Sequence, residues 1–193
     1  MAKPARSRAT YEDLLRVPEP MVAELVGGEL YASPRPSPIH AQAASAILAN
    51  LWTAFHFGRG GPGGWWILTE PELHLGEDVL VPDVGGWRRE RMPGLPETAA
   101  IELRPDWVCE VISPATGRLD RVRKMPVYAA NGVPRLWLID PGFRTLEVFR
   151  LHGPGWLLVT AHGGDAVVRA EPFDAIEMDL LALWGESRPA PAP

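Results

Sequence analysis

Short apolar runs separated by glycine and proline recur along the chain, and the first of them predict a small helix followed by a hairpin. Thr10 followed by Asp13 resembles the cap at a helix start, and the prolines after residue 17 stop the short helix predicted over 11–17. Residues 21–26 (MVAELV) and 29–33 (ELYAS) have the pattern of short strands. The two glycines between them permit a tight turn, so we expect a β-hairpin.

Apolar residues recur at helical spacing in two longer runs. The first begins after Ser37 and predicts a helix over 38–55 that ends before a glycine-rich loop. The second predicts a helix over 119–130, and Pro126 inside it is expected to kink the helix or split off its first turn. Residues 178–184 (MDLLALW) predict a short closing helix.

Continuous or alternating apolar runs predict the strands of a sheet: 65–75, 79–87, 106–112, 135–140, 145–151 and 155–161. The run 106–112 is apolar on both faces, which is typical of a strand at the centre of a sheet, and Glu110 within it is conspicuous. The whole pattern predicts one mixed α/β (α+β) domain over 10–186. We expect a flexible stretch over 1–9 and a mobile Pro/Ala tail over 187–193.

Composition places the chain among soluble globular proteins. Its 193 residues are 46% hydrophobic and 22% charged, which is enough apolar material for a substantial core. A net charge of −5 argues mildly against a polyanionic partner unless the basic residues gather on one face. The lone Cys109 cannot form an intramolecular disulfide, and no run is long and apolar enough to span a bilayer. We therefore expect a cytoplasmic protein with no membrane association.

Two acidic residues stand out because each belongs to an apolar run. Asp83 follows VLVP and Glu110 follows DWVC, so both carboxylates are expected to be partly withdrawn from water. Taken alone, Asp83 is typical of a turn after proline, and Glu110 fits a structural ion pair with an arginine. An ionised carboxylate in an apolar strand is costly unless it is paired or bound to metal. Because divalent metals such as magnesium prefer carboxylate oxygens, the two acids are also candidate metal ligands.

Three polar residues share one face of the second long helix. Asp120, Lys124 and Tyr128 are spaced four residues apart, so they form one stripe if the helix continues past Pro126. A surface salt bridge, worth well under ~1 kcal/mol, is the simple interpretation of this spacing. The other interpretation is that the Lys124 ammonium faces the two acids and offsets charge that develops on a phosphate.

The order of these segments resembles a known nuclease group. VPDV, PDWVCEVISPAT, the spacing of Asp120, Lys124 and Tyr128, and GVPRLWLIDP are similar to the PD-(D/E)XK nuclease superfamily and to its Uma-two family of putative restriction endonucleases. The resemblance covers roughly residues 11–151. It implies a restriction-endonuclease-like fold, in which a central mixed β-sheet is flanked by helices and the N-terminal hairpin is an extension.

The resemblance also implies roles for individual residues. In the superfamily two acids bind one or two divalent metals and a lysine assists the attacking water, and Asp83 and Glu110 match the two acids. The Val111 carbonyl is the implied third ligand, and Mg²⁺ or Mn²⁺ the implied ion. The ordinary motif places its lysine two residues after the second acid, where this chain has Ile112. We therefore expect Lys124, on the next helix, to supply the ammonium.

Further residues match the family pattern, and some of them have a functional and a purely structural interpretation. Asp120 and Tyr128 are expected to support Lys124. Glu24 or Glu29 in the hairpin could complete the metal shell through a water, or both could be ordinary solvated carboxylates. His40 could touch a phosphate, although capping and packing at the start of the helix suit it better.

The implied activity is metal-dependent hydrolysis of DNA phosphodiester bonds by an endonuclease, with a homodimer expected because duplex cleavage needs two sites. Candidates for contacting DNA are the basic residues around the site, which equally suit a solubilising surface: Arg88, Arg89, Arg91, Arg118, Arg121 and Arg123. The main alternative is a catalytically idle relative that acts as a nucleic-acid-binding or dimerisation module. A tryptophan-rich ligand binder is less favoured, because most tryptophans lie in strand-like runs that suit a core.

Overall fold

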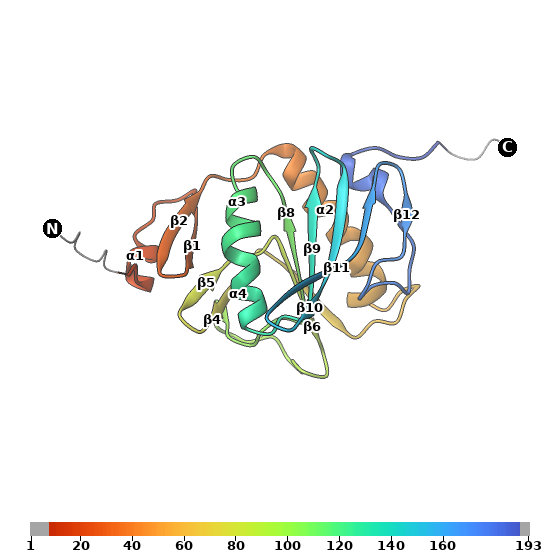
Figure 1. Ribbon diagram of the computed structural model, residues 1–193. Coiled ribbons are helices and arrows are strands. Elements are labelled where there is room, and N and C mark those ends of the chain that lie inside the picture. Colours follow the sequence, from red (N-terminus) through yellow and green to blue (C-terminus); the bar gives the residue numbers. More distant parts are fainter. Residues whose placement is uncertain (1–7, 190–193) are drawn as a thin grey trace.

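Two β-sheets form the framework of the computed structural model, which describes residues 8–189 (Figure 1). The larger sheet has six strands in the order β11-β10-β9-β8-β6-β3, and only its β8 and β9 run parallel. Its strands are β3 (Trp65–Thr69), β6 (Val84–Arg88), β8 (Trp107–Val111), β9 (Arg135–Asp140), β10 (Thr145–His152) and β11 (Gly155–Gly163). This mixed sheet with flanking helices confirms the expected α+β architecture.

The second sheet contains the N-terminal hairpin. Its order is β2-β1-β5-β4-β7, so the hairpin extends a sheet built from the middle of the chain and is not an isolated extension. Its strands are β1 (Val22–Val26), β2 (Glu29–Ser33), β4 (Glu72–Leu75), β5 (Asp78–Leu80) and β7 (Ala100–Ile101). The hairpin prediction is confirmed, and Gly27 and Gly28 both adopt the positive φ that its turn requires.

The two longest predicted strands are wrong as single strands. The run 65–75 divides into β3 and β4 at Glu70, which has a left-handed φ of 45°, and the run 79–87 divides into β5 and β6 at Pro82 and Asp83. In each case one half belongs to the larger sheet and the other half to the smaller. A proline next to an acidic residue marks each break, but the apolar residues on both sides suited a single strand because both halves are largely buried in their own sheets.

Strand β8 lies inside the larger sheet and is buried at every residue, as its apolar pattern predicted. Alternate side chains serve two cores. Trp107, Cys109 and Val111 belong to the cluster that includes the helix α2 (Pro38–Leu51), whereas Val108 belongs to the cluster that includes Tyr128 of the helix α4 (Met125–Ala130). Glu110 lies two residues after Val108 and therefore on the same face of β8, so its carboxylate is directed to the α4 side.

Tryptophans fill the core on the α2 side. Trp65, Trp107 and Trp137 each lie within 5.6 Å, ring centroid to ring centroid, of Phe173. All four residues are at most 2% exposed. These tryptophans therefore serve packing, and the interpretation as a tryptophan-rich ligand site is not supported for them.

The helical segments largely follow the prediction. The helix expected over 38–55 is α2 followed by one π-helical turn, η1 (Trp52–His56). The helix expected over 119–130 consists of α3 (Gly117–Leu119), a second π-helical turn η2 (Asp120–Lys124), and α4. Pro126 occupies the first turn of α4, directly after η2, and it has no N–H group to donate to the carbonyls of that preceding turn. The expected disruption at Pro126 thus takes the form of a wide turn directly before it.

The remaining elements are short. They are α1 (Tyr11–Leu15), β12 (Val167–Val168), β13 (Met178–Asp179) and the 3₁₀-helix η3 (Leu180–Trp184), which is the short closing helix expected over 178–184, although the first two residues of that range form β13. The predicted flexible stretch 1–9 and mobile tail 187–193 lie mostly outside the described residues. Of the described part, the Ala9 N–H donates to the Gly28 carbonyl, and Arg188 pairs with Asp179. Within residues 8–189 there is no helix with the length and apolarity needed to cross a membrane.

Candidate active site

The ends of two neighbouring strands bring the two predicted acids together. Strands β6 and β8 are antiparallel with Val84 opposite Cys109, which places Asp83 beside the end of β8. Asp83 lies in the break between β5 and β6, and its Oδ2 accepts a hydrogen bond of 2.6 Å from the Val111 N–H. The side chain of Glu110 is 2% exposed and that of Asp83 is 18% exposed. Asp83 is therefore the more accessible of the two.

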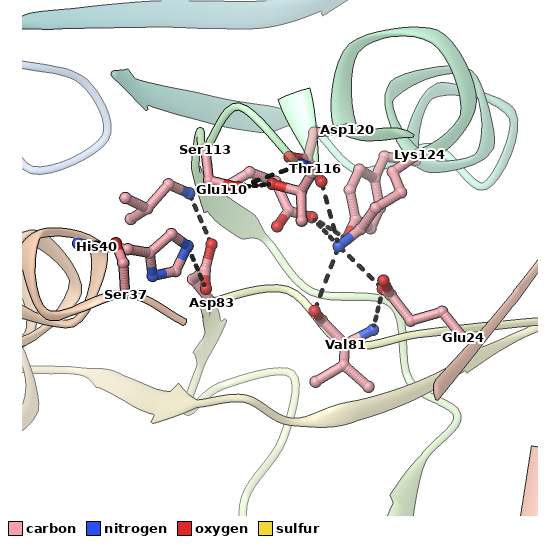
Figure 2. Close-up of polar contacts among 12 residues, drawn as sticks. Glu24, Ser37, His40, Val81, Asp83, Glu110, Ser113, Thr116, Asp120 and Lys124 are labelled. Atoms are coloured by element: carbon pink, nitrogen blue, oxygen red, sulfur yellow. Dashed lines mark hydrogen bonds and ion pairs between the residues drawn. The ribbon is translucent and has the colours of Figure 1, made fainter. Parts of the chain in front are cut away.

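Lys124 points inward toward the acids, so its interpretation as a surface salt bridge is wrong. Its side chain is 2% exposed, and its Nζ lies 2.8 Å from Oε1 of Glu110 and 2.9 Å from Oε1 of Glu24. The same ammonium lies 3.7 Å from Oδ1 of Asp120 and donates to the Val81 carbonyl at 3.2 Å. Figure 2 shows these contacts converging on Nζ from different parts of the chain.

Helix geometry explains how Lys124 reaches this position. Asp120, Lys124 and Tyr128 are all at most 3% exposed, so the predicted stripe is real and faces the sheet. The first two belong to the π-helical turn η2, where the Met125 N–H bonds to the Asp120 carbonyl. The Tyr128 hydroxyl donates a 2.6 Å hydrogen bond to Oε1 of Glu110. One oxygen of Glu110 is therefore held by both Lys124 and Tyr128.

The protonation of this cluster is set by burial and by its excess of acids. Burial raises the pKa of Glu110 well above its usual value; the Lys124 ammonium opposes this, and the neighbouring carboxylates add to it. Burial alone would lower the pKa of Lys124, but Glu110, Glu24 and Asp120 raise it above its usual value, so the ammonium keeps its charge. Burial likewise raises the pKa of Asp120, to about 6. Burial therefore disfavours the charged form of Glu110, and the Lys124 ammonium partly offsets this.

His40 is held against Asp83 on the other side of the site. It sits in the first turn of α2, whose N-cap Ser37 accepts from the His40 N–H, and its Nε2 lies 3.3 Å from Oδ1 of Asp83. Burial lowers the pKa of His40, but the hydrogen bond and charge of Asp83 and the Val111 carbonyl outweigh it, so the net shift is upward. The structure thus places the His40 imidazole in polar contact with the Asp83 carboxylate and at the cavity wall, an arrangement compatible with both interpretations of this residue (Figure 2).

A cavity of about 310 Å³ opens onto these residues. The predicted site residues that line it are Glu24, His40, Asp83, Glu110, Asp120 and Lys124. Glu29 does not line it; its carboxylate accepts from the Tyr31 hydroxyl and pairs with Arg123. Of the two hairpin acids, only Glu24 therefore faces the site.

The arginines proposed to contact nucleic acid do not line the cavity. Arg121 pairs with Glu147 at 2.8 Å and Arg123 pairs with Glu29 at 3.4 Å, while Arg118 is exposed. Two charged lining residues were missed from the sequence, Arg35 and Glu70. The prolines on both sides of Arg35 were the available signal, because they fix the backbone in an extended form next to the start of α2.

The donor set suits a hydrated magnesium or manganese ion. Among residues 8–189 no group of three or more His, Cys, Asp or Glu side chains is arranged to hold a metal. A closed zinc-type site therefore does not fit these residues. Magnesium instead takes one or two carboxylates and keeps several waters. Asp83 and Glu110 can supply those carboxylates, and the cavity has room for the waters.

Comparisons with known proteins concern the family and the fold. The family model Uma2, described as "Putative restriction endonuclease", matches residues 9–181. A crystal structure described as a putative nuclease belonging to DUF820, from Anabaena variabilis ATCC 29413, is similar with a TM-score of 0.74 and 21% sequence identity, over 92% of this chain and 98% of that chain. At this identity the likeness shows the fold. No curated protein matches the chain.

Proposed function

Because the chain belongs to the Uma2 family of putative restriction endonucleases, we propose that it is a metal-dependent endonuclease that hydrolyses DNA phosphodiester bonds. The observation that supports this most is that one cavity is lined by Asp83, Glu110 and Lys124, which come from three separate parts of the chain. The missing lysine at position 112 does not leave the site without an ammonium, since Lys124 lies 2.8 Å from Glu110.

In this proposal Asp83, Glu110 and the Val111 carbonyl hold Mg²⁺ or Mn²⁺. When bound, the ion supplies a Lewis acid and lowers the pKa of a coordinated water. The Val111 N–H fixes the orientation of the Asp83 carboxylate, and His40 holds its other oxygen. The Lys124 ammonium, fixed by the carboxylates around it, lies where it can stabilise negative charge that develops on the phosphate.

A second candidate is a nuclease fold that binds nucleic acid without cutting it. The observation that favours it is the enclosure of Lys124, whose ammonium already has Glu110, Glu24 and the Val81 carbonyl as partners. A lysine that only stabilises the fold through buried ion pairs would have the same contacts. Activity measurements separate the two candidates.

The test is nicking of supercoiled plasmid by the purified protein with Mg²⁺, with Mn²⁺ and with EDTA. We expect nicking only with metal, and we expect Asp83→Asn to abolish it while the protein stays folded, because Asp83 is not a partner of the buried lysine. Asp165→Asn is the matched control, since Asp165 is exposed and does not line the cavity. Equal metal-dependent nicking by Asp83→Asn and the wild type would overturn the proposed site.

Two further parts of the proposal concern assembly and location. Cutting both strands of a duplex requires two active sites, so we propose a homodimer, which sedimentation or light scattering measures directly. A DNA endonuclease with one buried free cysteine, Cys109, suits a reducing cytoplasm.

A further inference from the structure

One wall of the cavity is a short proline-flanked segment that carries an arginine. Residues 33–37 (SPRPS) connect β2 to α2, and all five line the cavity. Pro34 and Pro36 restrict the backbone on both sides of Arg35, which limits the entropy lost when the side chain binds a ligand. Arg35 is exposed, and within residues 8–189 it has no hydrogen bond or ion pair.

The charge of the cavity makes this arginine important. The carboxylates that line it are Glu24, Glu70, Asp83, Glu110 and Asp120. Lys124 is already shared among three of them, and the His40 imidazole contacts Asp83. An approaching phosphate therefore meets an acidic cavity, and Arg35 is the lining cation, among the described residues, whose charge no neighbouring acid offsets.

From these observations we propose that Arg35 binds a backbone phosphate of the nucleic-acid strand that is cut. This phosphate is a neighbour, along that strand, of the phosphate at which cleavage occurs. The proposal rests on the proposed nuclease function and deepens it, because it assigns the contact that positions the strand. Guanidinium binds two phosphate oxygens at once, and such contacts fix register without reading sequence. Arg35 is thus a substrate-positioning residue, and it acts on any sequence alike.

The experiment measures binding of two fluorescent 20-base-pair duplexes of unrelated sequence, with Ca²⁺ in place of Mg²⁺ to prevent cleavage, over a range of salt concentrations. We expect Arg35→Ala to weaken binding of both duplexes about tenfold. The slope of log affinity against log salt should fall by about one, as for the loss of one phosphate contact. Arg35→Lys should keep the slope and recover part of the affinity.

Arg59→Ala is the matched control, because it removes the same charge from an exposed residue beyond the opposite end of α2 and η1. We expect it to leave binding within about twofold of the wild type. If wild-type protein nicks DNA and Arg35→Ala binds as Arg59→Ala does, the assignment of Arg35 is overturned while the nuclease function stands. If the wild type neither binds nor nicks nucleic acid, both are overturned.

Discussion

Replacing Asp120 with asparagine should make the protein more stable at neutral pH. Asp120 is 3% exposed and belongs to a cluster in which three carboxylates share one lysine. Burial raises its pKa from 3.8 to about 6, against the opposing effects of Lys124 and the Thr116 hydroxyl. Its ionised form is therefore less favourable in the folded protein than in the unfolded chain.

The size of the effect follows from that pKa change. A rise from 3.8 to about 6 corresponds to about 3 kcal/mol, at about 1.4 kcal/mol for each pKa unit. Because the folded-state pKa is raised, the contribution of Asp120 to stability is fully present below pH ~4 and is lost as the pH rises through about 6. Asparagine has nearly the same shape and no charge, so the Asp120→Asn variant does not lose this stability as the pH rises.

The assay is urea unfolding followed by tryptophan fluorescence at pH 4.5 and pH 8, with EDTA to exclude metal. We expect Asp120→Asn to match the wild type within about 1 kcal/mol at pH 4.5 and to exceed it by up to about 3 kcal/mol at pH 8. If the variant is less stable than the wild type at pH 8, the ion pair with Lys124 outweighs burial and the reasoning is refuted.

Two other substitutions test the packing of the site and of the loop after η1. Tyr128→Phe removes the 2.6 Å hydrogen bond to Glu110, and we expect urea unfolding to show a loss of about 1–3 kcal/mol; an unchanged value would contradict the role of that hydroxyl. Gly61→Ala would place a Cβ 2.6 Å from the Cβ of Ala54, so we expect a loss of about 1–3 kcal/mol from steric overlap. Gly94→Ala, where an added Cβ meets nothing within 4 Å, is its control, and equal melting temperatures of the two variants would refute the clash.

Local patterns predicted the hairpin, α2 and the central strand β8 because each depends on residues close in sequence. The position of Glu110 was also readable, since an acid inside a strand buried on both faces needs a partner. Strand ends were missed at Glu70 and Pro82, although Glu70-Pro71 and Pro82-Asp83 are typical breaks, because the apolar residues on both sides suited one longer strand. The sheet assignment of a strand depends on distant neighbours.

The surroundings of the site were harder to predict than its acids. The burial of Lys124 depends on the packing of its helical segment, with η2 directly before Pro126, against the sheet. The four-residue spacing of Asp120, Lys124 and Tyr128 suited a surface stripe equally well. Glu24 and Glu29 lie on the same face of the hairpin, because Val26, two residues after Glu24, pairs with Glu29. Their different surroundings follow from position: Glu24 is buried and accepts from the Val81 N–H, whereas Glu29 is exposed next to the turn. Arg35 was missed because the sequence does not show that the connection between β2 and α2 borders the cavity.

The proposed active site requires that Lys124 take the place of the lysine absent at position 112. The most direct measurement is the metal-dependent nicking rate of Lys124→Met, with its folding verified by fluorescence. A second variant adds Ile112→Lys to it, which places an ammonium directly after β8, at a residue that packs against the same cluster as Val108 on the α4 side. We predict a loss of roughly 100-fold or more for the single variant and partial recovery for the double variant. Nicking by folded Lys124→Met at the wild-type rate would contradict the account.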